Sequence, residues 1–227
     1  GLLYAALLLA GSRGAWVGCL AGLAVMLSSA AVQVRESGGR WSRGPVMVMV
    51  ATLAAVSLWL GPTPVMENEH GAVTVGERIL STANAAAGTT EDRTLNHRYL
   101  LWKVAWQLIL DRPVLGIGLG RFADHAATVA GMWERDGSRF AHNEYLNYWV
   151  EGGLLTLVGF LGVVVSTVLR SRRRGLWPVA AGVGASVLVH GLVSYPLHMP
   201  ATAILFWVSL GIISTKRDNP VSQIEPR

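Results

Sequence analysis

The stretch AWVGCLAGLAVMLSSAAVQV, from Ala15 to Val34, decides the fold class. It carries no charged side chain over about twenty residues, and a helix of that length rises about 30 Å, the thickness of the hydrocarbon core of a bilayer. We therefore expect this stretch to form a transmembrane helix.

Further apolar stretches on both sides extend this prediction from one helix to a bundle. Composition agrees, because 52% of the residues are hydrophobic and only 15% are charged, a balance that is unusual for a water-soluble domain. The sequence predicts an all-α, polytopic transmembrane helical bundle with five complete spans and one truncated stub. The stub is Leu2–Ala10, and the other spans are Val46–Leu60, Gly152–Leu169, Trp177–Val193 and Pro196–Thr215.

The N-terminal residues carry no signal-peptide pattern. The chain opens inside the apolar stub without Met, without a charged segment before the stub and without a small-residue cleavage site after it. We expect the chain to be a piece of a longer protein.

The basic residues predict the orientation of the spans. They gather in three clusters, and two spans separate each cluster from the next, so one topology places all three on the cytoplasmic side. The net charge of +5 is therefore mainly a topology signal, and we expect no nucleic-acid partner. The clusters are Arg35/Arg40/Arg43, Arg170/Arg172/Arg173/Arg174 and Lys216/Arg217.

The same topology places a large polar loop, Gly61 to Glu151, on the outer side, and this loop holds most of the fourteen acidic residues. The expected division is transmembrane helices over 1–60, with the first one truncated, and the outer catalytic loop over 61–151. Three transmembrane helices then occupy 152–215, and a cytoplasmic tail occupies 216–227.

Within the loop, the segment from Glu67 to Arg93 lacks periodicity, and we expect it to be irregular or weakly helical. The segment His97 to Leu110 is different, because Tyr99, Trp102 and Trp106 recur at spacings of three and four. This pattern predicts an amphipathic helix at the membrane surface, where Trp and Tyr side chains are favourable.

Cofactor motifs are weak in this sequence. Gly116, Gly118 and Gly120 do not have the spacing of a dinucleotide fingerprint, and a tight backbone turn is the better interpretation. The loop histidines form no i, i+4 pair, and Cys19 is the only cysteine, so we expect neither a metal site nor another cofactor. These histidines are His70, His97, His125 and His142.

Three side chains on the outer face could carry chemistry. Arg13 and Arg98 each have two interpretations, a solvated or snorkelling charge and a bidentate phosphate clamp. His142 lies where the loop re-enters the membrane, and it is either structural or a base that accepts a proton from a hydroxyl group. Glu151, nine residues later, would lie about opposite on a continuous helix and is not paired with it.

Five segments together resemble one known family more than any single motif does. In order and spacing they are similar to the O-antigen ligase family, which also includes O-antigen polymerases and the oligosaccharyltransferases that glycosylate pilin. The segments are SRGAW (Ser12–Trp16), RYLLW (Arg98–Trp102), DRPVLGIGLGRF (Asp111–Phe122), HNEYL (His142–Leu146) and EGGLL (Glu151–Leu155).

The resemblance implies the C-terminal half of a membrane-embedded glycosyltransferase of the GT-C type. It implies a location in the bacterial inner membrane with the loop in the periplasm, and a glycan on undecaprenyl diphosphate as donor, with no metal ion. Carried over by position, Arg13 and Arg98 bind the donor diphosphate, and His142 activates the acceptor hydroxyl. Further candidates for contact with the glycan or the acceptor are Arg112, Arg121, Glu151 and Tyr195.

Several acceptors remain open at this point. The leading interpretation is a ligase that transfers the glycan to lipid A core oligosaccharide, and the alternative is a polymerase that extends a growing polysaccharide. A protein acceptor is a third option. A lipid-glycan transporter without chemistry is more remote, because polarity gathers in one outer loop rather than at mid-membrane.

Overall fold

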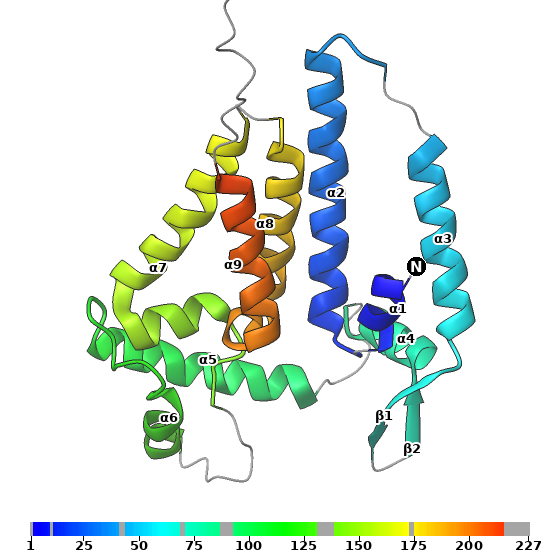
Figure 1. Cartoon of the computed structure of the whole chain (residues 1–227). Coiled ribbons are helices and arrows are strands. Elements are labelled where there is room, and N and C mark those ends of the chain that lie inside the picture. The colour runs from blue at the N-terminus through cyan, green and yellow to red at the C-terminus, as the bar shows by residue number, and fades with distance from the viewer. Residues whose placement is uncertain are drawn as a thin grey trace, which may run out of the picture.

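The computed structural model describes residues 2–9, 11–40, 44–68, 71–86, 93–130, 139–172 and 175–215, and these are mostly helical (Figure 1). The helices are α1 (Leu2–Leu9), α2 (Arg13–Glu36), α3 (Gly44–Leu60), α4 (Val75–Ala86), α5 (Arg93–Asp111), α6 (Phe122–Ala130), α7 (Glu144–Arg172), α8 (Trp177–Gly191) and α9 (Pro200–Ser214), with a 3₁₀ turn, η2 (Pro196–His198). Two short strands are β1 (Pro64–Asn68) and β2 (Gly71–Thr74).

Two helices, α2 and α7, are long and apolar enough to cross a membrane by length and composition. By contrast, α8 and α9 have 15 residues each and rise about 22 Å, less than a hydrocarbon core of about 30 Å. They are shorter than the predicted spans because residues 192–199 form a turn and η2. Pro196 lacks an N–H group and begins η2, and Pro200 begins α9.

Among the described helices, α2 and α8 have the most extensive contact, and small residues make it possible. Gly14, Gly18 and Gly22 recur every four residues along one face of α2. A Cβ atom at Gly18 would lie 2.6 Å from the Ser186 carbonyl oxygen, and one at Gly22 would lie 2.6 Å from that of Gly182. This spacing of small residues is typical of close helix packing in membranes, and sequence reasoning overlooked it.

A break at Gly153 divides α7 into two parts. Gly153 has φ 74° and ψ −179°, which lies outside the helical region. Figure 1 shows the first part lying across the ends of the other helices beside α5, and the second part rising next to α8 and α9. The predicted span Gly152–Leu169 corresponds to the second part, and the first part belongs to the polar region.

The loop that follows α5 holds the bend of α7 in place. The N–H groups of Ile117 and Gly118 donate to the carbonyl oxygens of Val150 and Glu151 at 2.8 and 3.0 Å. The three glycines of this loop all have positive φ angles, so the predicted tight turn is confirmed. They are Gly116 (69°), Gly118 (104°) and Gly120 (72°).

The prediction for the segment Glu67 to Arg93 is confirmed in part, because α4 is helical, but it did not include the two strands. Strand β1 pairs antiparallel with β2, and α4 follows directly. The N–H group of Glu77 donates to the Thr74 hydroxyl at 3.2 Å, and the Glu77 carboxylate accepts the N–H of Thr74 at 2.8 Å. This reciprocal capping fixes the start of α4. The described chain is therefore not all-α, because it contains this two-stranded sheet.

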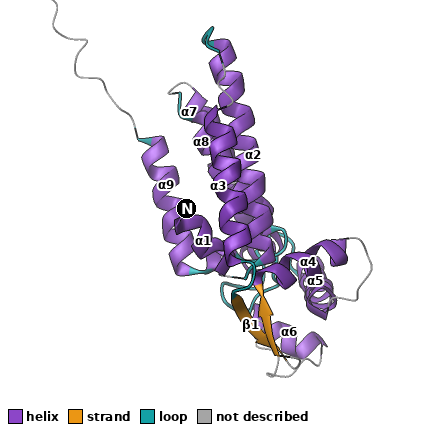
Figure 2. Ribbon diagram, turned by 90° about the vertical axis from the view of Figure 1, so that its right-hand side faces the viewer, coloured by secondary structure: helices purple, strands orange, loops and turns teal. Residues whose placement is uncertain are grey.

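The polar elements gather at one end of the long helices, which we term the loop end. Figures 1 and 2 show β1, β2, α4, α5 and α6 beyond the lower ends of α2, α3 and α8. The described basic residues of two clusters, including Arg35 and Arg170, lie at or near the other ends of α2 and α7. Arg43, Arg173, Arg174, Lys216 and Arg217 lie outside the described residues.

Large apolar side chains cover much of the outer surface of these helices. Leu20 on α2 is 59% exposed, Leu58 on α3 is 81% exposed, and Leu205 on α9 is 68% exposed. An apolar surface of this kind indicates contact with lipid or with further protein rather than with water.

Candidate active site

The candidate site is built around the short segment that leads into α7. His142 has φ 51°, and within the described residues it is the one non-glycine residue with a positive φ angle. This conformation costs free energy for a residue with a side chain and persists only where neighbours hold it. The Oδ1 atom of Asn143 accepts the N–H groups of Tyr145 and Leu146 at 3.0 and 3.1 Å, which caps α7 immediately after His142.

Two further hydrogen bonds fix the backbone on either side of His142. The N–H group of Ala141 donates to the Oδ1 atom of Asn147 at 2.8 Å. The Nδ2 atom of Asn143 donates to the carbonyl oxygen of Leu192 at 3.0 Å. The position of His142 is thus set by α7 and by the segment that follows α8.

Aromatic rings pack against the His142 imidazole. The ring of Tyr195 lies edge-on to it, with ring centres 4.8 Å apart and an interplanar angle of 76°. Phe140 packs against Tyr195 with ring centres 4.7 Å apart. Tyr195, a candidate contact residue from the sequence, is therefore next to His142.

Burial and nearby basic side chains lower the pKa of His142. Burial, the guanidinium of Arg98 and the ring of His97 together lower the pKa of His142 from 6.5 to about 4, and burial has the largest effect. Arg98 and His97 both lie in the first half of α5, one of the helices at the loop end (Figure 1). His142 is consequently neutral at pH 7, the state in which an imidazole can accept a proton.

Arg13 enters this region from α2. It begins the helix, and a Cβ atom at the next residue, Gly14, would lie 3.0 Å from Cδ2 and 3.4 Å from Nε2 of His190 on α8. Gly191, the next residue of α8, lies against α7, because a Cβ atom there would be 3.0 Å from the Cβ atom of Glu144. The start of α2, the first half of α5 and the start of α7 therefore meet at the loop end.

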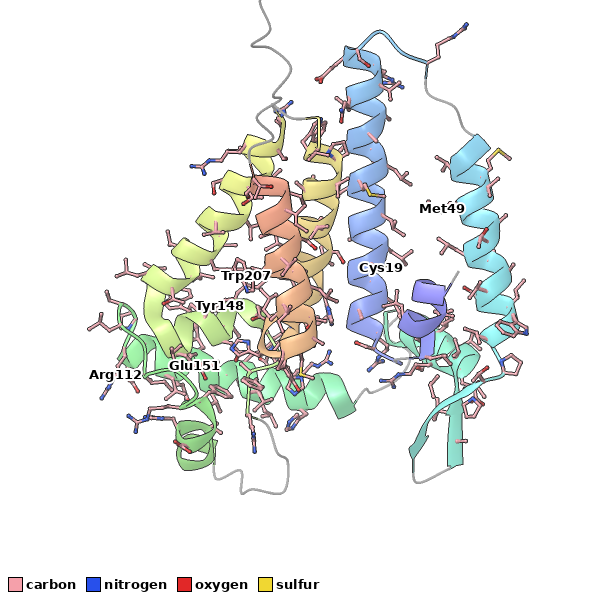
Figure 3. The ribbon with its side chains drawn as sticks, viewed as in Figure 1. Cys19, Met49, Arg112, Tyr148, Glu151 and Trp207 are labelled. Carbon is pink, nitrogen blue, oxygen red and sulfur yellow. The ribbon has the colours of Figure 1, made fainter. Side chains whose placement is uncertain are left out.

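Three other candidates from the sequence lie elsewhere. Arg112 follows the last residue of α5, about 20 Å along the helix axis from Arg98, and Figure 3 shows its side chain on the outside of the molecule. Arg121 is exposed as well. Glu151 is buried, with 5% of its surface exposed, and it lies at the bend of α7.

Sequence reasoning overlooked a buried pair beside His142. Glu144 is 1% exposed, and its Oε1 atom lies 2.9 Å from Nδ1 of His198. Its Oε2 atom accepts the N–H of Leu197 at 3.2 Å. Glu144 stands inside the HNEYL segment, but its partner is 54 residues away, and no sequence spacing indicates that contact.

Metal-binding geometry is not seen in the part of the chain that the structure describes, where no three His, Cys, Asp or Glu side chains come together. The Nδ1 atom of His125 lies 3.0 Å from the Arg121 carbonyl oxygen. His70 lies outside the described residues.

Comparison with known proteins gives two matches. A family model described as O-antigen ligase matches residues 1–161, which include Arg13, Arg98 and His142. A Rickettsia conorii protein that is provisionally named a polysaccharide ligase is 23% identical over 171 residues. That match covers 70% of this chain and 38% of the relative, so the chain spans less than two fifths of the relative's length. This chain belongs to the O-antigen ligase family.

Proposed function

We propose that the chain forms the active-site part of an O-antigen ligase-like glycosyltransferase. The enzyme moves a glycan from undecaprenyl diphosphate to lipid A core oligosaccharide at the periplasmic face of the bacterial inner membrane. One observation carries this proposal: His142 is held at the start of α7 with a φ of 51° and its ring against Tyr195, where the charge of Arg98 helps to lower its pKa.

The chemistry assigns one role to His142. An acceptor hydroxyl attacks C1 of the donor sugar while His142 takes the hydroxyl proton. The bond between C1 and the diphosphate oxygen breaks, and the diphosphate leaves with the electron pair. Attack from the face opposite the leaving group inverts the anomeric configuration.

Arg13 and Arg98 bind the diphosphate in this proposal. The leaving diphosphate gains negative charge as the bond to C1 breaks, and fixed guanidinium groups stabilise that charge. The bound diphosphate also offsets the positive charge of Arg98, which raises the pKa of His142 above its value of about 4 in the free protein. Donor binding thereby makes His142 a stronger base when it is needed.

Placement in the membrane follows from the same proposal. Residues 61–151 form the periplasmic catalytic loop, 1–60 and 152–215 contribute transmembrane helices, and 216–227 face the cytoplasm. Family membership and the exposed apolar faces of α2, α3 and α9 support this arrangement. A lipid-linked donor also requires a site at the membrane surface, where Tyr195 and the remote candidates Arg112, Arg121 and Glu151 could meet glycan or acceptor.

A polymerase of the same family is the second candidate function, because family membership and the name of the relative fit both. Deletion of the gene distinguishes a ligase from a polymerase. Loss of a ligase leaves long polymer on the lipid carrier, whereas loss of a polymerase leaves single repeat units.

The decisive experiment is the His142→Ala substitution in the full-length protein. Membranes from cells that lack the enzyme supply the lipid-linked glycan, and lipopolysaccharide without polymer serves as acceptor. We expect transfer, measured by gel, to fall at least about 100-fold, the usual contribution of a general base. His125→Ala, on α6, is the matched control and should keep full activity.

Normal transfer by a well-inserted His142→Ala protein would refute the catalytic assignment. The Arg13→Gln and Arg98→Gln proteins test the donor site separately, because each should raise the KM for the lipid-linked glycan. A transporter without chemistry would instead move the glycan across the membrane and form no product on the purified acceptor.

A further inference from the structure

The buried carboxylate of Glu144 links the start of α7 to the last outer turn by two contacts. One oxygen lies 2.9 Å from Nδ1 of His198, and the other accepts the N–H of Leu197 at 3.2 Å. Glu144 therefore has partners for both oxygens, as a buried carboxylate requires.

The turn that Glu144 holds carries aromatic groups that reach His142. The His198 ring packs against Phe140 with ring centres 4.7 Å apart, and Phe140 packs against Tyr195 at the same separation. Tyr195 in turn contacts the His142 imidazole at 4.8 Å. A continuous series of ring contacts thus runs from the Glu144 and His198 pair to His142.

The pair also lies beside the strained backbone of His142. Glu144 is two residues from His142, and its Cβ is 3.0 Å from the position that a Cβ atom at Gly191 would take. Movement of Glu144 would therefore shift the start of α7 against the end of α8. Because Asn143 is bonded to Leu192 in the same place, such a shift reaches His142 through the backbone as well as through the rings.

We propose that Glu144 and His198 are positioning residues that set the direction of the His142 imidazole. This inference rests on the proposed function of His142 and deepens it. Neither residue touches the reacting atoms in this scheme. The contact between Glu144 and His198 holds the turn that carries Tyr195 against His142. The Tyr195 ring then keeps the His142 imidazole in the direction in which its nitrogen meets the acceptor hydroxyl.

Substitutions at His198 test whether the contact between Glu144 and the Nδ1 atom of His198 is needed. The amide nitrogen of Asn occupies roughly the place of Nδ1, which faces Glu144, whereas that of Gln occupies roughly the place of Nε2. The full-length His198→Ala, His198→Asn and His198→Gln proteins are assayed with lipid-linked glycan extracted from cells and with polymer-free lipopolysaccharide. Thermal midpoints and yields from membranes are measured in parallel.

We expect His198→Ala and His198→Gln to lower kcat about 10- to 100-fold, the scale of a misplacement of about 1 Å. The KM for the lipid-linked glycan should stay within about twofold, because the diphosphate site is intact, and His198→Asn should restore most of the kcat. If His198→Ala does not insert, the comparison of Asn with Gln still decides the question.

Equal kcat values for the Asn and Gln proteins, or an unchanged kcat in His198→Ala, would overturn the positioning role. His142→Ala is measured alongside so that the two proposals fail separately. If the His142→Ala protein is active, the proposed function itself is refuted. If the His142→Ala protein is inactive and the His198→Ala protein is fully active, only the positioning role is refuted.

Discussion

The carbonyl oxygen of Pro113 accepts the indole N–H of Trp149 at 2.9 Å. The same oxygen also accepts the backbone N–H of Leu154 at 3.0 Å, just past the break at Gly153. Backbone groups that lose their helical partners at the break are thus satisfied by the loop that follows α5. The bend of α7 is a fixed part of the site, because it turns the first part of α7 toward α5.

Trp149→Phe should destabilise the protein modestly. The substitution removes the indole donor to Pro113 and keeps an aromatic ring near Trp106, so the expected loss is about 1 kcal/mol, or about 2–4 °C in the unfolding midpoint. Trp59→Phe, on a side chain that is 77% exposed, is the control. Equal midpoints for both proteins would contradict a stabilising role for the bond.

Gly153→Ala should disrupt the bend. A Cβ atom at this position would overlap the carbonyl group of Val114, and the φ angle of 74° is unfavourable for alanine. We expect a loss of at least about 2 kcal/mol and of transfer activity. Gly159→Ala, in the helical part of α7 with open space around it, should instead be neutral or stabilise by up to about 1 kcal/mol.

Gly18→Val should separate α2 from α8. The added atoms would meet the Ser186 carbonyl and the His190 Cβ, which lie 2.6 and 2.8 Å from the Cβ position, and overpacking of this kind costs about 1–3 kcal/mol. Gly211→Val, on α9 with no neighbour within 4 Å, serves as the control. Similar yields and thermal midpoints for the two proteins would argue against tight packing of α2 and α8.

The pH dependence of stability should include a contribution from His142. Its pKa in the folded protein is about 4, below the ordinary 6.5, so the unfolded chain binds a proton between these values and the folded protein does not. This contribution is fully present above about pH 6.5 and is lost as the pH falls toward 4. His142→Gln should reduce the slope of the unfolding midpoint against pH in this window.

The pH dependence of transfer should differ between the free and the donor-bound enzyme. The acid limb of kcat/KM reports the free enzyme and should lie below pH 5. The acid limb of kcat should lie at higher pH, because the bound diphosphate offsets the charge of Arg98. Coincident limbs would show that the donor does not act on His142.

Arg98→Gln tests whether the charge of Arg98 acts both on the donor diphosphate and on the pKa of His142. We expect the KM for the lipid-linked glycan to rise about 10- to 100-fold, the value of a charged hydrogen bond. The acid limb of kcat/KM should also move upward, since a positive charge that lowers the pKa of His142 is gone. Lys103→Gln, on the same helix and exposed to solvent, controls for a general loss of charge and should change neither quantity.

Local sequence patterns predicted the helices well where periodicity was strong. The aromatic spacing after His97 indicated α5, and the uncharged run from Ala15 indicated α2. The hairpin was overlooked, and the start of α4 was not located, although Thr74 and Glu77 have the spacing of a capping box. The short strands, PVMEN and GAVT, lack the alternation that a half-buried strand usually shows.

Contacts between distant segments could not be predicted from one sequence. Tyr195 was a candidate contact residue, but its ring contact with His142 depends on how α8 ends and α9 begins. The contact between Glu144 and His198 spans 54 residues, and neither residue has a spacing that points to the other. Arg112 and Arg98 lie in neighbouring motifs, yet the length of α5 places them far apart.

Several supports of the His142 segment lie beyond the residues that match the family model. The match ends at residue 161, whereas Asn143 and Glu144 are held by Leu192, Leu197 and His198. A chimera joined at the match boundary would unite the HNEYL segment of one protein with the 192–198 turn of another. We therefore expect an exchange between relatives to keep these contacts only if residues 141–144 and 190–198 are transferred together.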